Sequence, residues 1–343
     1  MKQHLNTLFV TTQGAYVGKQ GQSVVVRVDD ETRLQMPLHN LAGIVCFGQV
    51  SCSPALMAAC SEAGLTISFL TESGRFQAAV HGFSRGNVLL RREQYRRADD
   101  EAATLAVARN FIAAKIANAR TVLLRGVRDY PDAPGREDLT RVAARLAACV
   151  RQVPGAASLD MLRGIEGESA NLYFGVFNHL ITAQQVDFTL NGRNRRPPLD
   201  PVNSLLSFLY AMLAHDARSA CEACGLDAAV GFLHRDRPGR PGLALDLMEE
   251  FRPFLADRLA LSLINRQQVR ATGFHATESG GIEMDESTRK TVITAYQQRK
   301  QALTTHPFLG EEVSVGLTIH LQARLLARYL RGDLDAYPAF LAK

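Results

Sequence analysis

The chain has 343 residues, of which 46% are hydrophobic and 21% charged, and its formal net charge at pH 7 is +5. This length allows two domains with hydrophobic cores, and the composition excludes a disordered or fibrous protein. The six cysteines lie mostly in apolar stretches, which argues against the disulfide framework of a secreted domain.

The first residues, MKQHLNTLFVTTQG, lack an apolar segment as long as that of a signal peptide. No uninterrupted apolar run reaches the roughly 18–20 residues that a helix needs to span a bilayer. We therefore expect a cytoplasmic protein without a membrane partner.

Strand signals dominate the N-terminal region. Short β-branched and aromatic runs, separated by turns that contain Gly, Asp or Asn, predict strands at LFVTT, AYVGK, SVVVRV, GIVCF, LTISFL and RFQAAVHG. One helix is expected at residues 53–63, where Ser53 can cap it and Pro54 suits its first position. Gly64 is expected to end this helix. These signals predict a small N-terminal β-rich domain over residues 1–95.

Basic residues gather near the end of this domain. The segment RGNVLLRREQYRR, residues 85–97, has five arginines against one glutamate, a local charge of +4. Such a segment can neutralise a phosphate backbone, although a solvated basic face is the common alternative. The candidate DNA contacts in this segment are Arg91, Arg92, Arg96 and Arg97.

From Asp99 onward, apolar residues recur at helical spacing. Helices are predicted over residues 99–127, 139–153, 158–181, 203–224, 243–251, 254–268, 285–303 and 317–331. A hairpin around Gly280 and Gly281 is expected to interrupt them. The predicted fold class is α+β, in which a small β-rich domain is followed by a larger all-α catalytic domain over residues 96–343.

A basic loop separates two of these helices. The segment DFTLNGRNRRPPLDP contains Gly, Asn and paired prolines, which exclude a helix. Its arginines, Arg193, Arg195 and Arg196, are candidate phosphate contacts, and an ordinary surface loop is the alternative.

The first candidate for chemistry is Glu166, which lies between Gly164 and Gly167 in a predicted helix. Each glycine costs the helix about 1 kcal/mol relative to alanine. The two glycines therefore indicate either a close approach to the backbone beside Glu166 or a tight crossing of helices.

The second candidate is His234, which ends an apolar segment and precedes a basic turn containing Arg235, Arg237 and Arg240. These arginines are further candidate DNA contacts. A single histidine is more often a hydrogen-bonded structural residue than a metal ligand, so His234 alone decides nothing.

The third candidate is the acidic helix LALDLMEEF. Asp246 precedes Glu249 by three residues and Glu250 by four, which puts the carboxylates on neighbouring turns of one face. One imidazole and two or more carboxylates suit Mg²⁺ or Mn²⁺, whereas a solvated acidic face is the alternative. The spacing alone does not show that Glu166 joins this group.

Four ordered segments, RGIEGESANLYF, LDPVNSLLSFLYAML, GLDAAVGFLH and GLALDLMEEFRP, resemble the motifs of the CRISPR adaptation integrase family. Residues 1–100 and the general length are most similar to its subtype I-C branch. The resemblance implies that Glu166, His234 and Glu249 bind the metal and that Asp246 is a further catalytic acid. Which of Asp246 and Glu249 binds the metal directly stays open, with Glu249 preferred.

The resemblance also implies the reaction and the partners. The 3′ hydroxyl of a short DNA fragment attacks a phosphodiester at the edge of a repeat, with Mg²⁺ or Mn²⁺ as the cofactor. The expected partners are double-stranded DNA, both as incoming fragment and as repeat array, and a second copy of the chain, joined through the β-rich domain. A small ferredoxin-like adaptation protein completes the expected hetero-oligomeric complex.

Two other functions remain open at this stage. A stand-alone divalent-metal nuclease that acts on branched DNA would use the same ligands, because only the attacking group differs. A non-catalytic DNA-binding scaffold would have no need of metal ligands.

Asp200 and Asn203 match the family's D-x-x-N pair, and we expect them to cap the helix that follows.

Overall fold

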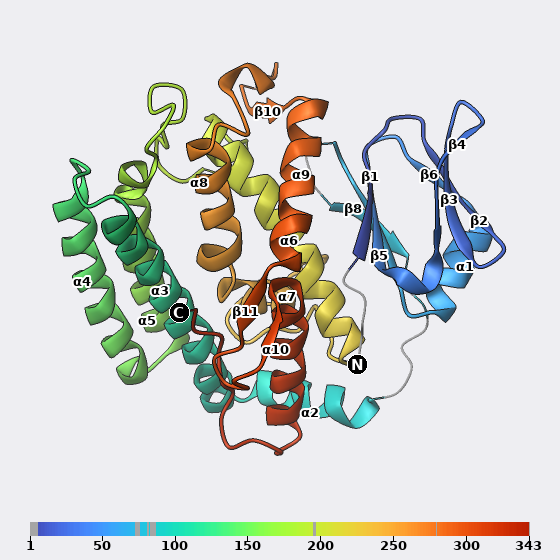
Figure 1. The fold of residues 1–343 in the computed structure, drawn as a ribbon. Helices are drawn as coiled ribbons and strands as arrows, with labels where there is room; N and C mark the ends of the chain where they lie inside the picture. Colours follow the sequence, from blue (N-terminus) through green and yellow to red (C-terminus); the bar gives the residue numbers. More distant parts are fainter. Residues whose placement is uncertain are drawn as a thin grey trace. The chain divides into compact units, whose positions relative to one another are not determined.

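The computed structural model describes residues 6–72, 76–80, 82, 87–194, 197–278 and 280–342. The chain forms two compact units with a mixed α+β fold (Figure 1). The first unit is Met1–Gly86 with Glu286–Ala302, and the second is Asn87–Asp285 with Leu303–Lys343. The division after Gly86 precedes the expected boundary at residue 95, and the β-rich unit also includes a helix from late in the chain.

Two β-sheets form most of the first unit. One sheet has the order β1-β5-β7-β8 and the other the order β4-β3-β2-β6. Their strands are β1 (Asn6–Val10), β2 (Tyr16–Gln20), β3 (Ser23–Val28), β4 (Glu31–Pro37), β5 (Leu41–Phe47), β6 (Ser51–Cys52), β7 (Thr66–Leu70) and β8 (Phe76–Val80). Val17, Val24 and Ile44 are among the buried residues that form the core of this unit. The predicted β-rich region is thus confirmed.

The helix predicted at residues 53–63 is also confirmed. Helix α1 (Pro54–Glu62) follows Ser53, whose side chain accepts a hydrogen bond from the backbone N–H of Leu56. Gly64 adopts a φ of +69°, a left-handed conformation that glycine tolerates at a helix end. The first unit also contains the 3-10 turn η1 (Leu38–Asn40) and helix α9 (Glu286–Gln301).

The second unit is mainly helical. Its helices are α2 (Val88–Asp99), α3 (Glu101–Asp129), α4 (Arg136–Gln152), α5 (Leu159–Gly175), α6 (Pro201–Ala223), α7 (Gly242–Glu249), α8 (Arg258–Asn265) and α10 (Val315–Leu330). Short 3-10 turns are η2 (Val153–Gly155), η3 (Phe177–Leu180) and η5 (Ala271–Gly273), and η4 (Arg252–Asp257) is a π-helix. Helix α3 packs against α4, α5 and α7. Helices α5 and α7 therefore both pack on α3.

Two features of the second unit differ from the sequence prediction. Helix α2 was not predicted, and it belongs to the helical unit although residues 88–95 were assigned to the β-rich domain. The hairpin of β9 (Phe274–Ala276) and β10 (Ile282–Met284) was predicted, whereas that of β11 (Leu303–Thr305) and β12 (Glu312–Ser314) was not. The larger unit is therefore predominantly helical rather than all-α, because these hairpins are part of it.

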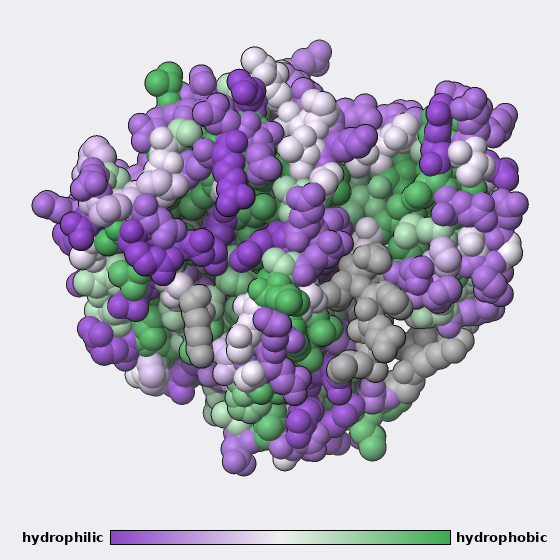
Figure 2. Space-filling view, in the orientation of Figure 1, coloured by the Kyte–Doolittle hydropathy of each residue, from purple (hydrophilic) through white to green (hydrophobic). Residues whose placement is uncertain are grey.

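Hydrophilic residues cover most of the face of the second unit that Figure 2 shows, with small hydrophobic areas between them. Large apolar residues such as Phe111, Leu206 and Phe251 are fully buried within this unit. Among the described residues, no helix combines the length and apolar character needed to cross a bilayer.

Candidate catalytic site

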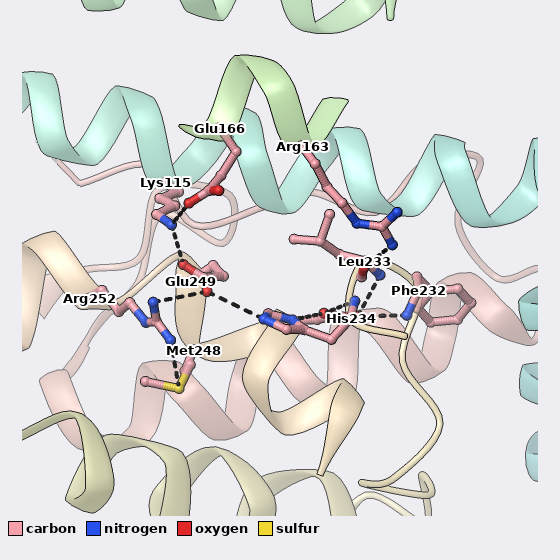
Figure 3. Close-up of polar contacts among 10 residues, drawn as sticks. Lys115, Arg163, Glu166, Phe232, Leu233, His234, Met248, Glu249 and Arg252 are labelled. Atoms are coloured by element: carbon pink, nitrogen blue, oxygen red, sulfur yellow. Dashed lines mark hydrogen bonds and ion pairs between the residues drawn. The ribbon is translucent and has the colours of Figure 1, made fainter. Parts of the chain in front are cut away.

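The three residues named as metal ligands lie in one cluster within the helical unit (Figure 3). Glu166 projects from the middle of α5, Glu249 ends α7, and His234 lies in the loop that precedes α7. The ammonium of Lys115 on α3 pairs with Glu166 and lies 2.8 Å from Oε2 of Glu249. Nε2 of His234 lies 3.9 Å from Oε1 of Glu249. The fold thus gathers two carboxylates, an imidazole and an ammonium.

Asp246 orients the histidine. This aspartate has no exposed surface, and its Oδ1 lies 2.6 Å from Nδ1 of His234. Its two oxygens also accept the backbone N–H groups of Phe232, Leu233 and His234 at 2.6–3.0 Å. The carboxylate of Asp246 can only accept hydrogen bonds, so Nδ1 of His234 must donate one. In a neutral imidazole the proton therefore lies on Nδ1, and the lone pair of Nε2 lies on the side of Glu249. Asp246 therefore positions His234, and its oxygens are already occupied.

Two glycines allow the loop to reach Asp246. A Cβ atom on Gly231 would lie 2.7 Å from the backbone of Gly242 and 2.8 Å from Oδ2 of Asp246. A Cβ atom on Gly242 would lie 2.6 Å from the carbonyl oxygen of Ala229. Because the loop passes so close to the start of α7, only glycine fits at these positions.

Positive charges hold Glu249 ionised although it is buried. Burial alone would raise the pKa of Glu249, but nearby charges, first Arg252 and then Lys115, lower it to about 2. Nη1 of Arg252 lies 3.2 Å from Oε1 of Glu249, and its guanidinium stacks on the ring of Tyr210 at 4.8 Å. Glu249 is therefore a charged ligand candidate throughout the physiological pH range.

The sequence reasoning missed Lys115 and Arg252. Lys115 lies in the apolar segment FIAAKIANA, and Arg252 follows Glu249 by three residues on a largely buried stretch. A charged residue inside an apolar helix is the signal that could have identified Lys115, since such a charge needs a partner. Its partners, however, come from helices that are distant in sequence.

A cavity of about 750 Å³ adjoins the cluster within the helical unit. Lys115, Glu166, Arg193, Arg252 and Asp257 are among its lining residues. Three of these five carry positive charge, so the cavity suits an anionic group. Its size falls within the usual range of ligand sites.

Asp257 is a buried carboxyl group on the wall of this cavity. It accepts hydrogen bonds from the hydroxyls of Tyr210 at 2.6 Å and Tyr173 at 3.1 Å. Burial raises the pKa of Asp257 to about 6, although both hydrogen bonds and the nearby Arg193 and Arg252 act in the opposite direction. Asp257 was not among the residues expected to matter.

The arginines of α2 divide into two kinds. Arg91 donates to the carbonyl of Gly225, and Arg97 donates to the carbonyl of Leu330. These contacts attach α2 to the rest of the helical unit. Arg92 and Arg96 are exposed.

The other candidate DNA contacts lie in two loops. Arg193 lines the cavity, while Arg195 and Arg196 lie outside the described residues. Arg235 and Arg237 are exposed and Arg240 is partly buried; Arg235 also pairs with Asp160 at 3.0 Å.

Asp200 and Asn203 have separate roles. The carboxylate of Asp200 caps α6 by accepting the backbone N–H of Asn203 at 2.7 Å, as predicted. Asn203 does not cap the helix: its Oδ1 accepts from Nη1 of Arg193 at 2.6 Å, and its Nδ2 donates to the carbonyl of Gly192 at 2.8 Å. Asn203 lies in the first turn of α6, where its side chain reaches back to hold the basic loop beside the cavity.

The glycines beside Glu166 do not mark a helix crossing. A Cβ atom on Gly164 or Gly167 would have no neighbour within 4 Å. Of the two explanations that the sequence offered, tight helix packing is therefore wrong. The open space leaves room for a molecule to approach the backbone of α5 beside Glu166.

The donor set fits a divalent cation, although Lys115 lies between the two carboxylates. In the described part of the chain, no three His, Cys, Asp or Glu side chains are arranged closely enough to hold a metal ion. Oε2 of Glu249 is buried and makes no hydrogen bond of standard geometry with any described group; its neighbour is the Lys115 ammonium. A charged oxygen in this state suits a cation, and carboxylates with one imidazole match the preference of Mg²⁺ or Mn²⁺.

Comparison with known proteins identifies the class. Residues 8–298 match the family model described as CRISPR associated protein Cas1. The chain is 54% identical over 341 residues to CRISPR-associated endonuclease Cas1 1 of Chlorobaculum tepidum, covering 99% of both chains. It is 52% identical to CRISPR-associated endonuclease Cas1 2 of Rhodospirillum rubrum, covering 100% of both. The chain is thus a CRISPR-associated protein, and it belongs to the Cas1 family.

Solved structures share the fold. A casposase bound to integration product superimposes with a TM-score of 0.83 at 21% identity, over 97% of this chain and 93% of the casposase. A chain of a Cas6-RT-Cas1–Cas2 complex superimposes with a TM-score of 0.83 at 21% identity, over 98% of this chain and 36% of that chain. The α+β architecture is therefore that of Cas1 proteins.

Proposed function

We propose that this protein is a divalent-metal-dependent DNA integrase that inserts short DNA fragments into a CRISPR array. Its relatives of more than 50% identity are named CRISPR-associated endonucleases, so the chain is a nuclease of this family. The observation that carries the assignment is the convergence of Glu166, His234 and Glu249, which come from two helices and a loop. The casposase, which shares the fold, is bound to an integration product.

Glu166, His234 through Nε2, and Glu249 would hold Mg²⁺ or Mn²⁺. When bound, such an ion polarises a phosphoryl oxygen and lowers the pKa of an attacking hydroxyl. Asp246 fixes the imidazole by accepting its Nδ1 proton, and Arg252 compensates the charge of Glu249. These residues thereby keep the proposed ligands oriented before DNA arrives.

The charged cavity and the exposed arginines supply the proposed DNA contacts. Arg193 and Arg252 line the cavity beside Glu166, where they would contact phosphates. Arg92 and Arg96 on α2, with Arg235 and Arg237 on the loop after His234, would add contacts that do not depend on DNA sequence.

The partners follow from the family. We propose a homodimer joined through the β-rich unit, together with a small ferredoxin-like adaptation protein. The similar chain from the complex that also names Cas2 supports such an assembly. We assign the protein to the subtype I-C branch on the character of residues 1–100. We place its reaction in the cytoplasm, where incoming DNA and a repeat array would meet.

Strand transfer and hydrolysis differ in the attacking group. A joining assay with a short DNA fragment and a repeat-containing plasmid separates integration from the alternative, cleavage of branched DNA alone. DNA transactions that are unaffected by removal of divalent metal would instead indicate a non-catalytic scaffold.

The ligand assignment is tested by replacing each proposed ligand. We expect Glu166→Gln, His234→Ala and Glu249→Gln each to abolish joining and to weaken Mn²⁺ binding, measured by calorimetry. Glu168→Gln is the matched control for α5, because Glu168 is a partly exposed glutamate that pairs with Arg145. Unchanged Mn²⁺ affinity in any two of the three ligand variants would contradict the assignment.

A further inference from the structure

We propose that the ammonium of Lys115 is the resident counter-ion of the metal-free site, and that a divalent cation must displace it from between Glu166 and Glu249. This inference rests on the proposed function, because it concerns how the same ligands change partners. In Figure 3 the lysine reaches from α3 toward both carboxylates, which come from α5 and α7.

The burial of these groups explains why a counter-ion is needed. The side chains of Lys115, Glu166 and Glu249 are 14%, 29% and 4% exposed, so water screens them poorly. Two carboxylates in such surroundings repel each other unless a cation lies between them. One ammonium that contacts both relieves the repulsion at the position where the proposed metal has its ligands.

The backbone around Lys115 is fixed. Asn118, one turn further along α3, donates to the carbonyls of Glu250 at 2.7 Å and Phe340 at 2.9 Å. Its Oδ1 accepts the N–H of Ala342 at 2.8 Å. Because α3 is held to the end of α7, an exchange of cations has to occur through the lysine side chain rather than through helix movement.

The lysine has space to withdraw. Lys115 lines the cavity of about 750 Å³, and its side chain has four rotatable bonds. Arg252 pairs with Oε1 of Glu249, whereas Lys115 contacts Oε2. Withdrawal of Lys115 therefore frees one oxygen of Glu249 for the metal while Arg252 still compensates part of its charge.

The test compares Lys115→Met with the parent protein in Mn²⁺ calorimetry and in thermal unfolding. We expect Lys115→Met to bind Mn²⁺ about tenfold more tightly, because the parent must first break two partly buried ion pairs. In EDTA the variant should unfold at a lower temperature than the parent, and saturating Mn²⁺ should raise its unfolding temperature by more than that of the parent. Arg125→Met is the control, since it removes a positive charge from α3 that pairs with Asp129 instead.

A second variant covers the case in which Lys115→Met does not fold. Lys115→Arg keeps the charge and offers a planar donor that suits carboxylates, so it should weaken Mn²⁺ binding by about threefold. Parent-like Mn²⁺ affinity in Lys115→Met, or in Lys115→Arg where the first variant does not fold, overturns the inference while leaving the ligand assignment intact. Unchanged Mn²⁺ affinity in any two of the three ligand variants would instead contradict the proposed ligand assignment, and the inference with it.

Discussion

At the scale of single residues, the site depends on hydrogen bonds that fix which atom is available. His234 could present either ring nitrogen, and Asp246 decides between them by accepting the Nδ1 proton. The sequence left open which of Asp246 and Glu249 binds the metal directly, with Glu249 preferred. The structure gives them different surroundings. Asp246 is saturated with N–H donors, whereas Glu249 lies beside the charged groups of Lys115 and Arg252, and its Oε2 accepts no hydrogen bond from a described group.

Asp246→Asn should reverse the histidine tautomer. If the amide oxygen accepts from Phe232 and Leu233, the amide NH₂ faces Nδ1 of His234, which must then become an acceptor. Nε2 would carry the proton and lose its lone pair. We expect Mn²⁺ affinity to fall roughly 10- to 100-fold in calorimetry, with a large loss of joining. The control is Asp160→Asn. It removes the carboxylate partner of Arg235, which lies in the same loop as His234. Equal losses in both variants would refute this explanation.

Asp257 should make stability depend on pH. Its pKa is raised in the folded protein from the ordinary 3.8 to about 6, so the folded state holds this proton more tightly than the unfolded state. The resulting stabilisation is complete below pH 3.8 and is lost as the pH rises through about 6. Relative to Asp257→Asn, the free energy of unfolding of the parent should fall by about 3 kcal/mol across this window. Urea unfolding of both proteins at several pH values measures this difference, and parallel curves would contradict it.

At the scale of elements, two glycines beside Glu166 lower the stability of helix α5. Gly164 and Gly167 are not needed for packing, because a Cβ atom on either one meets open space. Alanine should therefore stabilise the protein by about 0.5–1 kcal/mol at each position. If DNA approaches this face, the same substitutions should reduce joining at least about tenfold, a loss equivalent to about 1.4 kcal/mol.

Thermal unfolding and the joining assay together test this trade-off. Gly126→Ala provides the contrast, since its Cβ atom would collide with the side chain of Leu180 and destabilise the protein. Full joining activity in stabilised Gly164→Ala and Gly167→Ala proteins would show that no substrate comes near the helix backbone there.

Helix α2 combines attachment with exposed charge. Replacing Arg92 and Arg96 by Gln should weaken DNA binding and lower the slope of log affinity against log salt by about 2, because two phosphate contacts are lost. Replacing Arg91 and Arg97 by Gln should instead lower the unfolding temperature, since these side chains bind the carbonyls of Gly225 and Leu330. Fluorescence binding at several salt concentrations measures the slope. An unchanged slope in the Arg92/Arg96 variant would mean that these two arginines face solvent and do not contact DNA.

At the scale of the whole molecule, local signals predicted most elements and long-range contacts accounted for most errors. Helix α1 could be predicted because Ser53, Pro54 and Gly64 act locally. Helix α2 could not, because its segment VLLRREQYRRAD is mostly polar and it packs through few buried residues. Strand β4 was missed for a similar reason, since most of its residues are exposed.

The candidate site shows the same limit. Motif resemblance named Glu166, His234 and Glu249, but no local pattern could show that Lys115, more than 50 residues from Glu166, lies between two of them. The role of Asn203 was also misjudged, because its contact with Arg193 depends on the path of an irregular loop. Helices and strands can be predicted from local sequence, whereas the partners of buried charged residues become visible only in the packed fold.

The C-terminal segment shows how distant parts of the helical unit support the site. Glu250, next to Glu249, is fully buried and accepts from the hydroxyl of Tyr337 at 2.5 Å and from the N–H of Phe340 at 2.6 Å. Nε2 of Gln322 on α10 donates to the same carboxylate at 3.0 Å. The end of α7 is thus held by residues that follow it by more than 70 positions.

Tyr337→Phe should therefore destabilise the helical unit without removing the aromatic ring that packs on Phe111. The variant leaves one oxygen of the buried Glu250 without its hydroxyl donor, at a cost of about 1–3 kcal/mol in the free energy of unfolding. In a Glu250→Gln background the same substitution should cost less, because an uncharged amide depends less on that donor. A double-mutant cycle by urea unfolding measures the coupling energy. Additive effects would mean that the hydroxyl contributes independently of Glu250, for example through the hydrogen bond that it accepts from Gln322, and that it does not hold the end of α7.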